Sequence, residues 1–356
     1  MKLKKERIEW IDIARALTMF CVIVGHITPI GDIHTFMYSF HVPAFFFLSG
    51  MVTSCRGSFP QHTAKKIRTI MLPYYFFGIA AIAVYILLGH FIPQSSMLSL
   101  KDCFYGLAYG SAKTDCMKFN LHLWFLPVLF VMNIIIYPIR RIAKRLGKQG
   151  TVMCIAAVIS LVISALIFTY KPLNYFPLGA DTAVRLFPFF IAGNAASCSE
   201  RIMMPCKKSA ISTAVYTVAS VVLFALTAVL AKLNEMKTAE GFHVNYFRDY
   251  YGNSLLFWIA AISGIAAIIA VSKLIPPVKP LTYVGQKTLA ILVMQKFPIM
   301  LFNTVIPFTA VLLDSSNVIA ITVLSAVTVI CCLAVNLFAE RYLPFVYGKR
   351  YSIKKK

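Results

Sequence analysis

The chain has 356 residues, of which 59% are hydrophobic and only 13% are charged, and its formal net charge at pH 7 is +22. Soluble domains carry about 25% charged residues, so this composition excludes a soluble enzyme and indicates a polytopic membrane protein. The basic residues fall in short clusters between apolar runs, as membrane topology requires, and nucleic-acid binding is therefore not expected.

Ten apolar runs of about 20 residues, each bounded by charge, proline or glycine, predict an all-α bundle of about ten transmembrane helices. They lie near residues 11–31, 35–55, 70–92, 119–138, 151–170, 180–199, 209–231, 253–275, 286–307 and 317–339. The sixth and ninth runs are the weakest, because Arg185 interrupts one and Lys296 the other. We expect residues 1–356 to form one transmembrane domain with no separate soluble domain and no cleaved signal peptide.

Alternate loops differ in their content of lysine and arginine. The set that includes both termini carries 25 of these residues, whereas the opposite set carries 7. Short cytoplasmic loops are enriched in basic residues. The bias predicts that both termini are cytoplasmic and that the loop over residues 93–118 is external.

Cys103 and Cys116 differ from the other seven cysteines because they fall in this external loop. An oxidising compartment would allow them to form a disulfide, and the sequence leaves open whether they are bridged. No group of cysteines and histidines has the spacing of metal ligands, so no metal cofactor is expected.

The stretch Ala14–Pro29 of the first span carries an arginine, Arg15, and a histidine, His26. They are 11 residues apart, which places them on one helix face with a rise of about 16 Å between them. Arg15 then lies near the cytoplasmic mouth, where it either binds a ligand or reaches lipid phosphate. His26 lies in the outer half of the bilayer, where an ionisable group usually faces a cavity or a partner.

The second span, in "SFHVPAFFFLSG", brings another histidine to a similar depth. His41 lies about six residues below the external end of its span, and His26 lies about five below its own. Two imidazoles on adjacent antiparallel helices predict a polar site inside the bundle. Imidazole is the side chain that accepts a proton near neutral pH.

The stretch "WIDIARALTMFCVIVGH" followed by "FHVPAFFFLSG" resembles the acyltransferase-3 family of integral membrane O-acyltransferases, particularly the branch related to fucose 4-O-acetylase. Arg15 and His26 satisfy the family pattern of Arg or Lys, ten residues, then His. Further matching stretches follow in the same order: "KKIRTIMLPYYFF", "LWFLPVLF", "RLFPFFIAG" and "GQKTLAILVMQKFP". This chain departs from the pattern at Gln295, where relatives commonly have histidine, which puts a second base at that position in doubt.

The resemblance implies that cytoplasmic acyl-CoA, usually acetyl-CoA, donates an acyl group to a hydroxyl of a carbohydrate on the external side. A cationic inner mouth would hold the CoA phosphates. The candidates for this role are Arg15, Lys65, Lys66 and Arg68. The small residues Gly25, Ser49 and Gly50 leave room for the pantetheine arm or permit close helix packing.

A hydroxyl needs a base to become a good nucleophile, and His26 is the predicted general base. His41 would orient it, polarise the thioester carbonyl or relay the proton. Arg185, with Asp181 one turn before it, would bind the acceptor or the oxyanion, or else form an interfacial ion pair. Trp124 would stack on a sugar or anchor the helix at the membrane interface, and the role of His122 is equally open.

A membrane transporter or exporter of acylated saccharides is the alternative function, although the chain shows no duplicated halves. The expected partners are acyl-CoA, a carbohydrate or other hydroxyl acceptor and the lipid bilayer, in a bacterial plasma membrane. The sequence leaves open the identity of the acceptor, an acyl group longer than acetyl, an acetyl-histidine intermediate and the oligomeric state.

Overall fold

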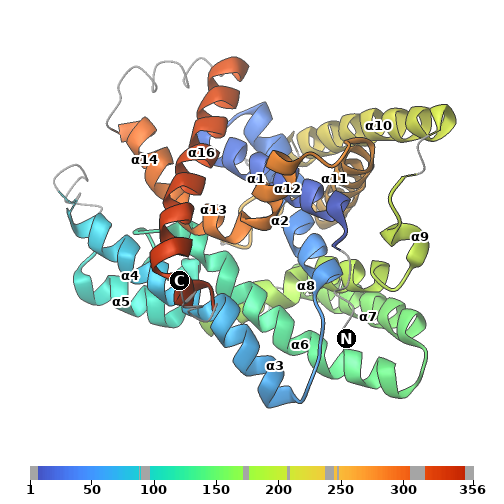
Figure 1. The fold of residues 1–356 in the computed structure, drawn as a ribbon, viewed down its shortest axis with the longest axis horizontal. Coiled ribbons are helices and arrows are strands. Elements are labelled where there is room, and N and C mark those ends of the chain that lie inside the picture. Colours follow the sequence, from blue (N-terminus) through green and yellow to red (C-terminus); the bar gives the residue numbers. More distant parts are fainter. Residues whose placement is uncertain are drawn as a thin grey trace, which may run out of the picture.

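The structure is a computed structural model that describes residues 7–87, 89, 97–170, 176–206, 209–236, 244–246, 248–304 and 317–348. It is an all-α bundle, as predicted (Figure 1). The longer helices are α1 (Glu9–Ile27), α2 (Asp32–Val52), α4 (Leu72–Leu87), α6 (Phe125–Arg145), α7 (Gln149–Tyr170), α8 (Ala180–Ala196), α10 (Ala210–Met236), α11 (Ser254–Leu274) and α16 (Val318–Tyr342). The shorter elements are α3 (Phe59–Lys66), η1 (Ile67–Met71), α5 (Leu100–Tyr109), η4 (Ala112–Thr114), η5 (Leu121–Trp124), η6 (Pro177–Gly179), α9 (Glu200–Met203), α12 (Lys279–Gln286), α13 (Thr288–Met294), α14 (Lys296–Thr304) and η7 (Pro344–Tyr347).

Within the described residues, 8 helical stretches are long and apolar enough to cross a membrane. They correspond to eight of the ten predicted spans, and the two exceptions are the runs that the sequence marks as weakest. The sixth run forms α8, which has only 17 residues and contains the buried Arg185. The ninth run begins where α12 ends, and its described part is divided between α13 and α14.

The ninth run breaks at two residues. Lys287, between α12 and α13, has φ −107° and ψ 11°, outside the helical region. Gln295, between α13 and α14, is followed by Pro298, which has no N–H to donate to the carbonyl of Met294. The short helices therefore leave residues of this run deep inside the bundle, whereas an uninterrupted helix would continue across the bundle.

The third predicted span begins earlier than its apolar run suggests. Residues 56–68 were expected to form a cytoplasmic segment between spans, but the helix starts at Phe59, after a capping box of Ser58 and Gln61. A π-helical turn, η1, joins α3 to α4. His62 donates a hydrogen bond of 2.9 Å to the Asn133 carbonyl, which fixes α3 against α6.

Close helix packing at three glycines builds the centre of the bundle. A Cβ on Gly50 of α2 would overlap the Phe190 carbonyl of α8, and a Cβ on Gly193 of α8 would overlap the Phe47 carbonyl of α2. A Cβ on Gly285 of α12 would overlap the backbone of Asp12 in α1. Gly50 therefore serves helix packing. Among the 8 helical stretches that could cross a membrane, those of α1 and α2 are the most buried, and those of α7 and α10 are the least buried.

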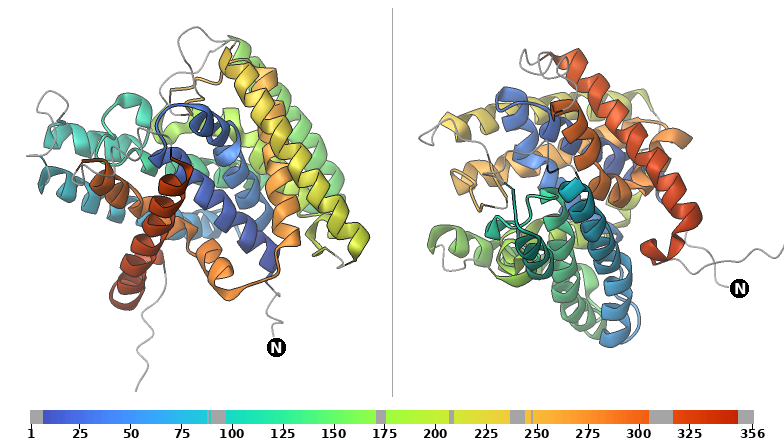
Figure 2. Two further views of the ribbon diagram at one scale, coloured as in Figure 1. Left: turned by 90° about the horizontal axis from the view of Figure 1, so that it is seen from above. Right: turned by 90° about the vertical axis from the view of Figure 1, so that its left-hand side faces the viewer.

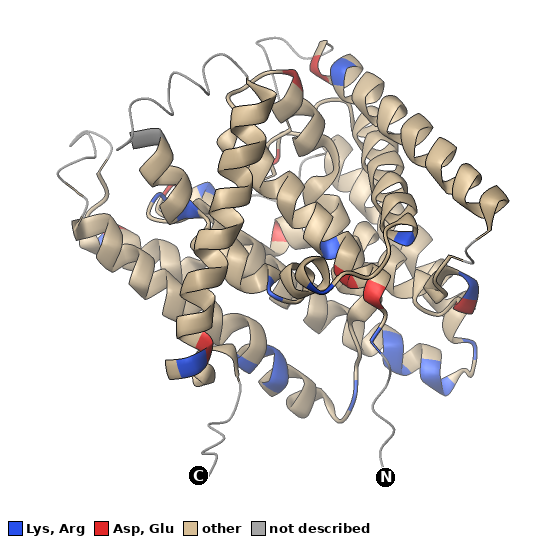
Figure 3. Cartoon of the chain, turned by 45° about the horizontal axis from the view of Figure 1, so that its top comes forward, with Lys and Arg blue, Asp and Glu red and all other residues tan. Residues whose placement is uncertain are grey.

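The two ends of the bundle differ in their content of lysine and arginine. Lysine and arginine residues gather toward one end of the bundle (Figure 3), which is the end where α1 begins and α16 ends (Figure 2). Both ends of the described chain therefore lie on one side, as the predicted topology requires. Which compartment this side faces stays a prediction.

The loop predicted to be external contains α5 and η4. Cys103 of α5 is buried, and Cys116 packs its backbone on Gly106, one turn further along α5. Both cysteines are free thiols. Burial and the nearby Asp102 raise the pKa of the Cys103 thiol above its ordinary value.

Candidate active site

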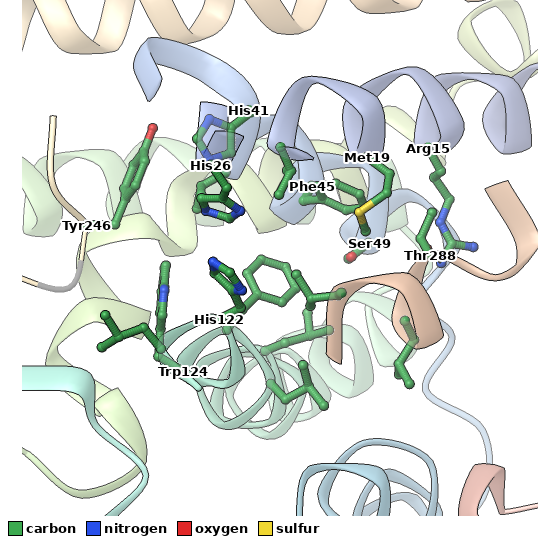
Figure 4. Close-up of a pocket in the computed structure, with 18 of the residues that line it drawn as sticks. Arg15, Met19, His26, His41, Phe45, Ser49, His122, Trp124, Tyr246 and Thr288 are labelled. Carbon is green, nitrogen blue, oxygen red and sulfur yellow. Dashed lines mark hydrogen bonds between the residues drawn. The ribbon is translucent and has the colours of Figure 1, made fainter. Parts of the chain in front are cut away.

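A cavity of about 180 Å³, which we call the histidine cavity, lies between α1, α2, the start of α6 and α13 (Figure 4). Polar groups occupy its two ends, and apolar side chains, among them Met19 and Phe45, separate them. Arg15 lies at one end, and His26, His41 and His122 lie at the other. The prediction that Arg15 and His26 share one face of the first helix is confirmed, since both line this cavity.

Three imidazoles form the histidine end. His26 stacks on His122 with ring centroids 4.0 Å apart, and its centroid is 6.1 Å from that of His41 in an edge-on arrangement. His26 and His41 therefore reach the same depth on adjacent helices, as predicted. The Nδ1 atoms of His26 and His122 are buried and have no hydrogen-bond partner among the described residues.

His41 is held in one tautomer. Its Nδ1 lies 2.6 Å from the carbonyl oxygen of Met37, and because a carbonyl only accepts, Nδ1 must carry the proton. The Nε2 of the neutral ring then keeps its lone pair. His41 is thus an oriented acceptor beside His26.

Aromatic side chains surround the histidines. Trp124 and Tyr246 both line the cavity, with nearly parallel rings whose centroids are 6.4 Å apart. The Tyr246 hydroxyl donates to the backbone carbonyl of Tyr38, and burial raises its pKa well above the ordinary value, so the phenol stays protonated. Trp124 therefore lies at the histidine end of the cavity, where a stacking role and an anchoring role are both compatible with its position.

Arg15 belongs to two cavities. Its Nη2 donates a hydrogen bond of 2.9 Å to the hydroxyl of Thr288, the first residue of α13. Besides the histidine cavity, it lines a second cavity of about 650 Å³, which we call the inner cavity, between the start of α1 and the ends of α2 and α8. Arg15 is thus the residue that the two cavities share, and Ser49 lines the histidine cavity close to it.

The other predicted phosphate ligands lie elsewhere. Neither cavity is lined by Lys65, Lys66 or Arg68. Lys65 and Arg68 are exposed, and the Arg68 backbone packs on Gly348 after η7. Lys66 approaches Cys55. Burial raises the pKa of the Cys55 thiol, and the charges of Arg140 and Lys66 offset part of this rise.

Arg185 lies in a buried ion-pair network and does not line the histidine cavity. It forms a salt bridge with Asp249, and Lys113 bridges Asp249 and Asp181. All four side chains are at most 13% exposed. The network joins α8 to η4 and to the segment before α11. The ion-pair interpretation of Arg185 therefore accounts for its surroundings.

Gln295 lies at the break between α13 and α14, with no exposed surface. Its amide faces His26, but neither of its polar atoms makes a hydrogen bond of normal geometry. Nearby, Asn120 donates from Nδ2 to the Val293 carbonyl and holds the break in place. Gln295 is therefore a polar neighbour of His26 rather than a base.

Sequence reasoning missed Tyr38, Tyr246 and Thr288, and it left the role of His122 open. Tyr38 precedes His41 by three residues on one helix, a spacing that places both on the same face. Tyr246 comes from the segment between α10 and α11, and no sequence pattern links it to the histidines. Thr288 reaches Arg15 only because the ninth run breaks.

The fold and this cavity define a multi-pass membrane protein with an internal histidine site, and Arg15 lies in the walls of both this site and the inner cavity. The model of the acyltransferase-3 family, described as an acyltransferase domain, matches residues 8–337. The chain therefore belongs to this family and is a membrane acyltransferase. No curated protein and no solved structure matches it significantly, and its place in the branch related to fucose 4-O-acetylase stays a prediction.

Proposed function

We propose that this protein moves an acetyl group from cytoplasmic acetyl-CoA to a hydroxyl of a cell-surface or lipid-linked carbohydrate, in a bacterial plasma membrane, with His26 as the general base. The observation that carries the proposal is the position of Arg15, which lines both the inner cavity and the histidine cavity. A donor whose charged end lies in the inner cavity can pass its acyl arm by Arg15 to His26.

The length and the lining of the histidine cavity suit this donor. The rise along α1 from Arg15 to His26 is about 16 Å, which is comparable to an extended pantetheine arm. Between them the wall is mainly apolar, with Met19, Val22 and Phe45. An uncharged arm crosses such a wall at little desolvation cost, whereas the phosphates of CoA would stay with the cations at the inner end.

The reaction forms one ester bond and breaks one thioester bond. The acceptor hydroxyl oxygen attacks the carbonyl carbon of the acetyl group while a nitrogen of His26 takes the hydroxyl proton. The C–S bond of the tetrahedral intermediate then breaks, and CoA leaves as the thiolate, which receives the proton from His26. The Nε2 of His41 accepts a hydrogen bond from the acceptor hydroxyl or from protonated His26.

The aromatic end of the cavity supports a carbohydrate as acceptor. Trp124 and Tyr246 offer flat apolar faces next to His26 and His41. A sugar ring places its C–H groups on such faces and leaves its hydroxyls at the rim, within reach of the imidazoles. This arrangement selects a hydroxyl near the histidines without requiring a charged group on the acceptor.

The test uses the full chain purified in lipid nanodiscs with radiolabelled acetyl-CoA. We expect release of CoA and transfer of label to a carbohydrate extract of the producing cells, and surface glycans from a deletion strain should lack the mass of one acetyl group. Absence of both acetyl-CoA hydrolysis and transfer would contradict the proposal. Uptake of a saccharide into liposomes without acyl-CoA would instead favour the exporter function.

A further inference from the structure

The inner cavity has a cationic character that the predicted lysines do not supply. Its wall comes from the start of α1, the ends of α2 and α8, the start of α7, Arg140 of α6 and Met203 of α9. The charged residues in this wall are Arg7, Asp12, Arg15 and Arg140. Three cations therefore face one carboxylate.

That carboxylate is already paired. Asp12 accepts two hydrogen bonds from the guanidinium of Arg7 and lies 3.5 Å from the amide of Gln286. Neither Arg15 nor Arg140 forms a salt bridge with any acidic residue in the described part of the chain. Two positive charges in the wall of the cavity thus have no anionic partner.

Arg140 is the less satisfied of the two. Its terminal nitrogens make only long contacts with neutral groups, at 3.4 Å to Gln149 Oε1, 3.4 Å to Ser197 Oγ and 3.7 Å to Cys198 Sγ. Its Nε is buried and has no hydrogen-bond partner. A partly desolvated guanidinium in this state gains most from an anion with several acceptor oxygens, and a phosphate has the matching geometry.

A second feature of the same wall favours an anion. Helix α7 begins at Gln149, and Gln149 and Gly150 both line the inner cavity. The first turn of α7 contains no acidic residue that would offset the positive end of the helix dipole. The space at Gly150 is open, since an added Cβ would meet only the Cβ of Cys198, at 3.9 Å.

We propose that the inner cavity binds the phosphates of the 3′-phosphoadenosine diphosphate end of the acyl donor, with Arg140 and the first turn of α7 as the phosphate-binding groups and Arg15 at the passage to the histidine cavity. This inference rests on the proposed function, because it assumes a CoA thioester as donor. It assigns phosphate binding to α6 and α7 and leaves Lys65, Lys66 and Arg68 outside the site.

The test compares two donors in the full chain, in nanodiscs. Acetyl-CoA carries the nucleotide, whereas acetyl-pantetheine has the same thioester and arm without any phosphate. We expect Arg140→Gln to raise the KM for acetyl-CoA by about tenfold to 100-fold, the range for a lost hydrogen bond to a charged group. The KM for acetyl-pantetheine and the kcat should stay close to those of the wild type.

Arg141→Gln is the matched control, because it removes the same charge from the next residue. Arg141 is exposed and lies over the ring of Tyr137, 5.9 Å from its centroid, outside the inner cavity. This variant should leave both KM values unchanged, and Lys65→Gln should do the same. Arg140→Lys, which keeps a charge but loses the planar fork, should fall between wild type and Arg140→Gln.

Two results would overturn the inference. One is an unchanged KM for acetyl-CoA in folded Arg140→Gln, and the other is an equal rise for both donors. If Arg140→Gln does not fold, adenosine 3′,5′-bisphosphate should still compete with acetyl-CoA in the wild type far better than adenosine does, and equal competition would also overturn it. If the wild type uses neither donor, the proposed function itself fails.

Discussion

Two regions of this protein bury ionisable side chains, and they differ in whether those side chains have partners. In the ion-pair network, Lys113 and Arg185 are matched by Asp181 and Asp249. At the histidine end of the cavity, no acidic residue in the described part of the chain forms a salt bridge with His26, His41 or His122. Both regions consist of costly groups inside a membrane bundle, but only the second lines the histidine cavity.

The difference separates structural charges from groups that are available for chemistry. Buried polar groups in folded proteins almost always have partners, so an orphan in a cavity wall indicates a ligand or a reacting group. Arg15 and Arg185 illustrate this point, because each is the single lysine or arginine of its apolar run. Arg185 is neutralised by Asp249, whereas Arg15 donates to the Thr288 hydroxyl and lines two cavities.

The largest expected effect comes from the histidine end. His26→Gln keeps a hydrogen-bonding side chain of similar size but cannot act as a base near pH 7. General-base catalysis contributes about 100-fold to 10,000-fold, so turnover of acetyl-CoA at saturating acceptor should fall by at least about 100-fold. The thermal midpoint and the binding of CoA should change little, because the lost interaction belongs to the transition state.

His41→Gln is the companion variant for this comparison. Its Nδ1–H bond to Met37 orients the ring, and we expect a smaller loss than for His26→Gln if His41 orients or polarises. Retention of more than about a tenth of wild-type turnover in folded His26→Gln would contradict the general-base assignment.

The ion-pair network should respond in stability rather than in turnover. Arg185→Met leaves Asp249 with Lys113 alone, and loss of one partner from a buried pair costs up to about 3–5 kcal/mol of unfolding free energy. The KM for the acceptor in the protein that still folds should stay near the wild-type value. Thermal melts and acceptor titrations measure the two quantities separately.

A double variant sharpens this prediction. Arg185→Met combined with Asp249→Asn removes one charge of each sign and leaves Lys113 paired with Asp181. It should recover part of the stability that the single variant loses, since no carboxylate is left without a cation. A rise of at least tenfold in the acceptor KM of folded Arg185→Met would instead assign Arg185 to the binding site.

The sequence predicts the fold well wherever a run is apolar and uninterrupted. Eight of the ten predicted spans form long helices, and the face shared by Arg15 and His26 follows from helical periodicity alone. The sequence marks the other two runs as weak, and Pro298 accounts for the break at Gln295. Where the resulting short helices lie in the bundle depends on tertiary packing, which the apolar pattern does not record. Arg185 pairs with Asp249, which lies 64 positions later in the chain. Local spacing points to Asp181 instead, because Asp181 lies one helical turn before Arg185.

The candidate site was predictable only in its helical part. His26 and His41 lie on adjacent spans, and their depths can be counted from the span ends. Tyr246 and Arg140 come from segments whose place in the bundle is set by long-range packing. The sequence shows a cationic cluster at Lys65, Lys66 and Arg68, yet these residues, on α3 and η1, line neither cavity.

The smallest expected effect concerns Gln295, which faces the histidine end from the break between α13 and α14. The buried Nδ1 of His26 and the buried amide of Gln295 both have no partner, and a small rotation of either side chain would let the amide oxygen accept from Nδ1–H. Such a bond would leave Nε2 of His26 as the basic nitrogen. A neutral hydrogen bond contributes about 0.5–1.5 kcal/mol, so Gln295→Leu should lower kcat by about twofold to tenfold and leave the KM for acetyl-CoA unchanged.

Gln295→Glu, which keeps an acceptor at the same place, should retain more activity than the leucine variant and shift the pH profile of kcat, because a carboxylate favours the protonated imidazole. Equal losses in the two variants, with unaltered pH profiles, would show that Gln295 only fills space.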